Sequence, residues 1–106
     1  MLGDESQSLL LGPTRLIGEV CIIDNGVVVA HDSKIGPGVH LAPGVSTGGS
    51  VQIGSRTIVG IKSSVATGTI IGENCIVSVG TAVTRDVPNN SVIEGVPGKI
   101  IGVRKN

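Results

Sequence analysis

An aliphatic residue recurs at every sixth position over most of this chain. Eleven of twelve successive positions at this spacing are Ile, Leu or Val, and the exception is Thr47. The positions are Ile17, Ile23, Val29, Ile35, Leu41, Thr47, Ile53, Val59, Val65, Ile71, Val77 and Val83. A period of six fits neither a helix face nor the two-residue alternation of a strand. It is typical of a parallel β-helix built from hexapeptides, so the sequence predicts that fold.

The composition supports a fold without a broad core. The 106 residues include 17 glycines and no Phe, Trp or Tyr, whereas a compact globule of this size normally buries several aromatic rings. Stacked aliphatic and small side chains can fill the narrow interior of a solenoid, and glycine suits its tight corners. Eight basic and eight acidic residues give a formal net charge of zero. This balance and the lack of aromatic stacking surfaces argue against a nucleic-acid-binding protein.

The repeat divides the chain into three parts. We expect an irregular lead or partial coil over 1–16, a regular β-helix over 17–88, and a C-terminal turn and tail over 89–106. Asn89 begins a turn signal and Pro97 lies in a second one, so a short strand is expected between them.

Nothing in the sequence predicts membrane insertion or export. No apolar run approaches the roughly 20 residues of a transmembrane helix. The short run Leu9–Leu11 follows the acidic pair Asp4-Glu5, which is unlike a signal peptide. The expected location is the cytoplasm.

Three hexads make one triangular coil, so residues 18 apart stack as neighbours in a parallel sheet. We number each hexad from its aliphatic residue as position 1; positions 1 and 5 are expected to point inward, and positions 3 and 6 outward. The four coils are then 17–34, 35–52, 53–70 and 71–88. Cys21 and Cys75 occupy position 5 three coil steps apart, too far for a disulfide, which favours two buried thiols.

One outward column of position-6 residues is mostly apolar. It consists of Ile22, His40, Ile58 and Ile76. An apolar stripe where solvent is expected favours a partner surface, and we expect a homotrimer with parallel axes. The alternative is that these β-branched residues only favour the strand conformation.

A second outward column, at position 3, carries the candidate chemistry. It consists of His31, Gly49, Thr67 and Arg85. His31 and His40 are nine residues, or half a coil, apart and should not meet within one subunit. Across a trimer groove, His31 can approach His40 of the partner subunit, which predicts a site assembled between subunits.

Specific motifs add a family resemblance. The pattern HD-x-x-IG-x-x-VH, followed by APG and a glycine pair, is present as His31-Asp32, Ile35-Gly36, Val39-His40, Ala42-Pro43-Gly44 and Gly48-Gly49. With the ending VGTAVTRDVPNNSVIEGVPGKII, it resembles the left-handed β-helix hexapeptide-repeat acyltransferases, in particular the sialic-acid O-acetyltransferases and nucleotide-sugar N-acetyltransferases. The resemblance implies an all-β fold, a left-handed parallel β-helix of about four regular coils with a short C-terminal cap.

The resemblance also implies an activity and roles for named residues. The activity is transfer of an acetyl group from acetyl-CoA to a hydroxyl or amine of a sugar-type acceptor, such as a nucleotide-sugar. His31 resembles the general base, and the neighbouring Asp32 would fix its tautomer. The N–H of Gly49 resembles the donor to the thioester oxygen, where the lack of a Cβ lets the thioester approach. His40 resembles the second family histidine, near the acetyl group.

The remainder of the position-3 column suggests where CoA lies. A pantetheine arm that runs along the axis past Gly49 and Thr67 reaches Arg85. A cation there can meet a CoA phosphate. Lys99 is a second candidate, because its GVPGK segment resembles the family's turn near the adenine end of CoA.

Two departures concern the acceptor. The family often has Asn seven residues before the base as an acceptor contact, and this chain has Asp24 there, followed by Asn25. An Asp favours a donor-rich or cationic acceptor group. The family also has an N-terminal sugar-binding domain, which needs at least about 50 residues, and only the 1–16 lead precedes the repeat. We expect that this domain is lacking: another chain supplies it, the acceptor is small, or the sequence is a fragment.

Two other classes of function stay open. One is a non-catalytic trimeric scaffold. The other is zinc hydration chemistry of the γ-carbonic-anhydrase kind, which needs three histidines, whereas this chain has two and its cysteines are expected to face inward. No metal is expected.

Overall fold

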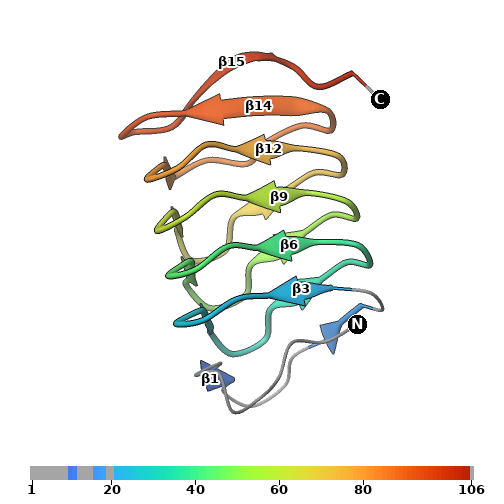
Figure 1. Cartoon of the computed structure of the whole chain (residues 1–106), viewed down its shortest axis with the longest axis vertical. Helices are drawn as coiled ribbons and strands as arrows, with labels where there is room; N and C mark the ends of the chain where they lie inside the picture. The colour runs from blue at the N-terminus through green and yellow to red at the C-terminus, as the bar shows by residue number, and fades with distance from the viewer. Residues whose placement is uncertain (1–9, 12–15, 19–20, 106) are drawn as a thin grey trace.

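The structure, a computed structural model, describes residues 10–11, 16–18 and 21–105, so most of the 1–16 lead lies outside it. The described chain is all β and winds into a left-handed parallel β-helix, which confirms the predicted fold. Its coils stack from the N-terminal to the C-terminal end (Figure 1). No helix in the described ranges is long and apolar enough to cross a membrane.

The strands form three sheets, one on each side of a triangular prism. Sheet A contains β1 (Leu10–Leu11), β4 (Val28–Val29), β7 (Ser46–Thr47), β10 (Ser64–Val65) and β13 (Ala82–Val83). Sheet B contains β2 (Leu16–Ile17), β5 (Lys34–Ile35), β8 (Gln52–Ile53) and β11 (Ile70–Ile71). Sheet C contains β3 (Ile22–Ile23), β6 (His40–Leu41), β9 (Ile58–Val59), β12 (Ile76–Val77), β14 (Ser91–Glu94) and β15 (Lys99–Val103). Each two-residue strand is position 6 followed by position 1 of the hexad.

The 18-residue register holds up to Val83. The partners in sheet A include Ser64 with Ala82, and those in sheet C include Ile58 with Ile76. The next step is two residues shorter, because Ile76 pairs with Val92, 16 residues on. Val87 accordingly bridges to Ile71 on side B, where a strict repeat would place residue 89.

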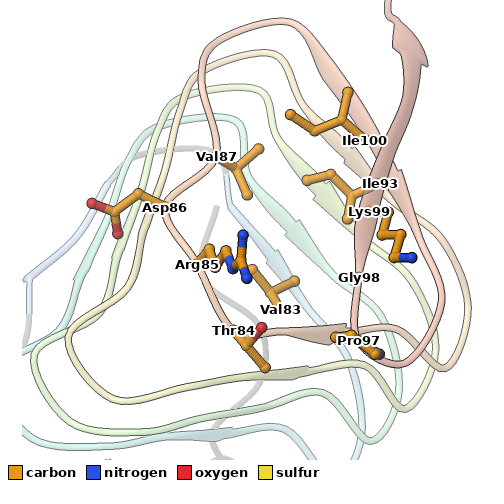
Figure 2. Close-up of a pocket in the computed structure, with 10 residues that line it drawn as sticks. All are labelled: Val83, Thr84, Arg85, Asp86, Val87, Ile93, Pro97, Gly98, Lys99 and Ile100. Carbon is orange, nitrogen blue, oxygen red and sulfur yellow. The ribbon is translucent and has the colours of Figure 1, made fainter.

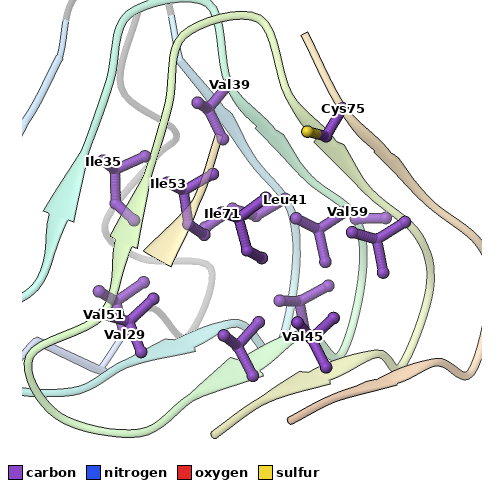
Figure 3. Packing of buried hydrophobic residues seen from close by; sticks show 14 of the residues in the cluster. Val29, Ile35, Val39, Leu41, Val45, Val51, Ile53, Val59, Ile71 and Cys75 are labelled. Carbon is purple, nitrogen blue, oxygen red and sulfur yellow. The ribbon is translucent and has the colours of Figure 1, made fainter. Parts of the chain in front are cut away.

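The core consists of stacked position-1 and position-5 side chains. Ile35, Ile53 and Ile71 lie in one row on the inner face of sheet B (Figure 3). Thr47, the exception in the repeat, also points inward and is 6% exposed; its Oγ1 accepts the Ala30 N–H at 3.3 Å. A single hydroxyl therefore fits this ladder because a backbone donor meets it.

Buried hydroxyls at position 5 connect successive coils. Thr57 Oγ1 donates to the Gly72 carbonyl at 2.7 Å and accepts the Cys75 N–H at 3.0 Å. Thr81 occupies the same position further along and is 1% exposed, and its Oγ1 has no hydrogen-bond partner among the residues that the structure describes. A position-5 hydroxyl can therefore connect successive coils, as that of Thr57 does, but the one on Thr81 does not.

The corners have a repeated backbone conformation. Position 4 has a positive φ in ten successive hexads: Gly26, Asp32, Gly38, Gly44, Ser50, Arg56, Lys62, Gly68, Asn74 and Gly80. Glycine adopts this conformation without steric cost, whereas Arg56 and Lys62 are strained by it. Position 2 is tight for another reason, since a Cβ on Gly54 would lie 2.6 Å from the backbone nitrogen of Glu73.

A hairpin closes the C-terminal end of the prism. β14 continues the parallel ladder of sheet C, and β15 returns antiparallel beside it (Figure 1). The connection between them bonds to the last strand of sheet A through Ala82, whose N–H donates to Gly95 and whose carbonyl accepts from Gly98. Arg104 continues the closure, donating from Nη1 to the Arg56 carbonyl at 3.0 Å.

Candidate functional site

The two histidines lie on opposite sides of the prism. His31 occupies the corner between β4 and β5, where sheet A meets sheet B. His40 is the first residue of β6 in sheet C, which is the side opposite that corner. One protomer therefore does not bring them together, as the half-coil spacing predicted.

The side chain of His31 is held between a carboxylate and a glycine. Its Nδ1 lies 3.2 Å from Asp32 Oδ2, and both side chains are largely exposed. The edge of the ring formed by Nδ1, Cε1 and Nε2 faces Gly49, one coil further along: an ideal Cβ on that residue would lie 2.6 Å from Cε1, 2.7 Å from Nε2 and 3.2 Å from Nδ1. A glycine is therefore required there if the ring is to keep this position, and Nε2 is the nitrogen left without a carboxylate partner.

The ladder of backbone hydrogen bonds does not use the N–H of Gly49. In this β-helix the N–H at position 4 donates to the position-3 carbonyl of the preceding coil, as Ser50 does to His31 and Gly68 to Gly49. The N–H at position 3 does not donate to the preceding coil. Among the described residues, no hydrogen bond is formed by the N–H of Gly49. Pro37 and Pro43 occupy position 3 elsewhere at no cost, because proline lacks only a donor that the ladder does not use.

His40 forms a separate pair with Asp24. Its Nε2 lies 2.9 Å from Asp24 Oδ2, and the two side chains are 37% and 40% exposed. The expected acceptor contact Asp24 therefore has a protein partner. Asn25, beside it, is exposed, and its carbonyl accepts the Gly44 N–H at 2.9 Å.

The two candidate phosphate ligands line a common pocket. Arg85 and Lys99 come from segments that face each other across a pocket of about 390 Å³ at the C-terminal end of the prism (Figure 2). The pocket is lined by Val83, Thr84, Arg85, Asp86, Val87, Ile93, Pro97, Gly98, Lys99 and Ile100. Thr67 is not among its lining residues; it lies one coil beyond Gly49 in the same column, exposed at a corner.

The outer face of sheet C combines apolar and polar side chains. Ile22, 55% exposed, lies directly before His40 in the ladder, and the half-buried Ile58 lies directly after it. The half-buried Ile76 and Val92 continue the column. In the described part of the chain, no group of three or more His, Cys, Asp or Glu side chains could hold a metal ion.

Known proteins resemble this chain in both its sequence repeat and its fold. The model of the bacterial transferase hexapeptide (six repeats) matches residues 16–49. A serine acetyltransferase of Synechococcus elongatus is 29% identical over 104 residues, which is 95% of this chain and 38% of that protein. The chain is therefore similar to bacterial hexapeptide-repeat transferases over part of its repeat and to an acetyltransferase over most of its length.

Solved structures of acyltransferases superpose well on this chain. A variant of perosamine N-acetyltransferase from Caulobacter crescentus, in complex with CoA and GDP-perosamine, has a TM-score of 0.77 and 29% identity over 90% of this chain and 54% of its own. A UDP-N-acetylglucosamine acyltransferase has a TM-score of 0.86 and 26% identity over 90% of this chain and 39% of its own. The chain thus spans about half, or less, of the length of these relatives.

Sequence reasoning missed two features of the site. The first is the contact between His40 and Asp24, although the columns contained it: His40 stacks on Ile22, and Asp24 follows two residues later. The second is the enclosure of the pocket by Asp86 and Ile100. No sequence signal located that pocket, because it depends on the shortened last coil and on the hairpin.

Proposed function

We propose that this chain is the catalytic β-helix of a cytoplasmic, acetyl-CoA-dependent acetyltransferase. The acceptor is a hydroxyl or amine of a sugar-type molecule, and the active form is a homotrimer. The observation that carries the proposal is the placement of the His31 ring edge against Gly49, whose N–H is unused. A base and an oxyanion donor lie side by side there, which is what acyl transfer requires.

The residues account for each step of the transfer. Asp32 holds Nδ1 of His31, so Nε2 takes the proton from the attacking hydroxyl or amine while its oxygen or nitrogen bonds to the thioester carbon. The carbonyl oxygen becomes negative and accepts a hydrogen bond from the Gly49 N–H. The carbon–sulfur bond then breaks, and the departing CoA thiolate takes the proton back from the imidazolium. One base thus serves both halves of the reaction.

The charges suit CoA as the donor. Arg85 and Lys99 bring two cations to one pocket at the C-terminal end of the prism, where CoA phosphates are expected to bind. Thr67 lies beside the route from this pocket to Gly49. The relatives support this assignment, since the perosamine enzyme is described in complex with CoA and a nucleotide-sugar.

The position of His40 supports a shared site. His40, Asp24 and Asn25 lie on or beside the side of the prism opposite His31, so they reach a reacting acetyl group only from a partner subunit. The apolar column around His40 is the surface that we expect to pack in the trimer. Acceptor contacts would then come from one subunit, and the base from the next.

Binding of CoA is the first test. CoA at millimolar concentration is expected to raise the melting temperature by mass action, and exchanging both Arg85 and Lys99 for Ala should weaken this shift. Ser55→Ala, at position 3 of a different corner, is the matched control and should leave the shift unchanged. A wild-type protein that shows no shift would contradict the proposal.

Transfer is tested next by release of the CoA thiol in the presence of amino sugars and sugar nucleotides. His31→Ala should lower kcat by about 10²–10⁴-fold, the usual contribution of a general base. If His31→Ala retains full activity, or if no acceptor releases thiol while CoA binds, the acetyltransferase assignment fails and a trimeric scaffold becomes the better description.

Mixing experiments test the shared site. In a trimer that contains both His31→Ala and His40→Ala subunits, one of the three interfaces receives both native histidines. Random mixing of equal amounts should therefore restore roughly a quarter of the wild-type activity. A mixture that stays as inactive as either variant alone would place both histidines in one subunit's site and refute the shared arrangement.

A further inference from the structure

The two histidines are paired through opposite ring nitrogens. His31 meets its carboxylate, Asp32, through Nδ1, whereas His40 meets Asp24 through Nε2. In a neutral imidazole the nitrogen that donates to a carboxylate carries the proton, and the other nitrogen has the free lone pair. The two rings are therefore set to present different nitrogens, Nε2 of His31 and Nδ1 of His40.

Backbone hydrogen bonds hold the two residues of the second pair on neighbouring coils. The Asp24 N–H donates to the Leu41 carbonyl at 3.0 Å, and the His40 N–H donates to the Thr57 carbonyl at 3.0 Å. The two residues therefore lie on consecutive coils, and the ladder fixes the spacing of their backbones. Ile22 and Ile58 are the neighbours of His40 in the same outer column, one coil before it and one coil after it.

We propose that Asp24 is a positioning residue for His40, which it holds as the Nε2–H tautomer so that Nδ1 accepts a hydrogen bond from a donor group in the active site. Asp24 then acts through the imidazole and not directly on the acceptor. This proposal rests on the proposed function for its catalytic consequence, although the pairing itself can be tested without any substrate.

The resulting site would contain two imidazole nitrogens with free lone pairs, one from each of two neighbouring subunits. His31 uses Nε2 to remove a proton, while Nδ1 of the partner subunit's His40 receives a hydroxyl, amine or amide hydrogen and fixes the group that bears it. In metal sites, loss of the residue that orients a ligating histidine costs about 10- to 100-fold in affinity or activity, and we use the same range here. Asp24→Ala should accordingly lower kcat/KM by about that factor, and His40→Ala by at least as much.

A double-mutant cycle separates positioning from direct contact. If Asp24 acts only through His40, adding Asp24→Ala to His40→Ala should cost no further activity, because the group that Asp24 orients is already gone. Multiplicative losses in the double variant would mean that Asp24 contacts the acceptor itself, and would overturn the proposal. Thermal melts of all three variants show whether folding is intact.

The pairing of His40 with Asp24 can also be tested by NMR spectroscopy, which needs neither a substrate nor an active enzyme. The chain has only two histidines, so long-range proton–nitrogen correlation spectra give two ring patterns that single substitutions assign. Above the usual titration range of histidine, His40 should show a protonated Nε2, and Asp24→Ala should alter only that pattern. Asp32→Ala is the matched control and should alter only the pattern of His31.

The two arms distinguish the possible failures. A His40 ring protonated at Nδ1 in the wild-type protein would refute the pairing, whatever the activity. A protein with the expected His40 pattern but no acyl transfer to any acceptor would contradict the proposed function and leave the pairing established. A normal ring pattern together with multiplicative kinetic losses would refute the positioning role alone.

Discussion

Gly49→Ala gives a sharp test of the geometry at the candidate site. The added Cβ would lie 2.6 Å from Cε1 of His31, whereas ordinary van der Waals contact begins at 3.4 Å, so the ring must retreat by about 0.8 Å, the difference between these distances. The φ of Gly49 is outside the left-handed range, so alanine strains no backbone there. His31 is 59% exposed and can swing outward. The free energy of unfolding should therefore change by no more than about 0.5 kcal/mol.

The displacement is large on the scale of catalysis. A misplacement of about 1 Å commonly costs about 100-fold in rate, so a retreat of 0.8 Å should lower kcat/KM by roughly 30- to 100-fold. That loss corresponds to about 2–2.7 kcal/mol of transition-state stabilisation. Gly49→Ala retains both the His31 imidazole and the backbone N–H at residue 49, so a loss of activity would report on the position of the ring and not on the absence of a catalytic group.

The assay is the initial rate of CoA thiol release with the best acceptor, measured beside a thermal melt. Gly102→Ala is the control, since its Cβ would meet nothing within 4 Å; it should retain full activity and stability. Retention of activity within threefold of wild type in Gly49→Ala would refute the reasoning. So would a lower melting temperature, because the effect would then not be confined to the His31 ring.

Three further predictions concern stability, measured by denaturant and thermal unfolding at one fixed protein concentration. Thr81→Val should stabilise the fold by about 1 kcal/mol, because it removes an unpaired buried hydroxyl. Thr57→Val should destabilise the fold by about 1–3 kcal/mol, because the Gly72 carbonyl and the Cys75 N–H lose their partner. Equal effects of the two substitutions would contradict this account. Gly54→Ala should cost about 1–3 kcal/mol through overlap with the next coil, against no change for Gly102→Ala. Lys62→Gly should stabilise by about 0.5–1 kcal/mol by relieving its φ of 57°; a loss of stability would show that this strain is unimportant.

The interior of the molecule could be predicted from the sequence because its period is strict. One side chain at position 1 faces the axis in every hexad, so counting in steps of 18 gave the partners of Ile35 and Ile53 correctly. Thr47 keeps its place in the 18-residue register although it is polar, because its hydroxyl accepts the Ala30 N–H. Periodicity identifies neighbours wherever the backbone repeats.

The closed end was harder to predict because the backbone stops repeating there. Val87 was expected at position 5, but it bridges to Ile71 on side B after a corner two residues shorter than the others. Asp86, where a regular corner would have a positive φ, instead accepts the Ile70 N–H through its side chain at 2.8 Å. The position of Arg85 relative to Gly49 therefore does not follow from an 18-residue count.

At the candidate site, the column of His31 and Gly49 followed from the count, whereas the carboxylate partners did not. Asp32 was expected beside its histidine simply because it is adjacent in sequence. The contact between Asp24 and His40 depends on the directions of two outward side chains on neighbouring coils. Hexad positions specify which residues are close, and side-chain rotamers then decide which atoms meet.

Because the ladder does not use the N–H at position 3, a site of the His31–Gly49 kind could be built at more than one coil of the prism. A position-3 residue other than proline has an N–H that the ladder does not need, so the architecture provides a potential oxyanion donor at such a corner unless a side chain takes it, as Asn89 Oδ1 takes that of Glu73. A reactive centre then needs only a histidine at one corner and a glycine 18 residues later. Because the backbone repeats in the regular coils before Val83, such a centre can shift by whole coils within them, in evolution or in design, without any change of fold.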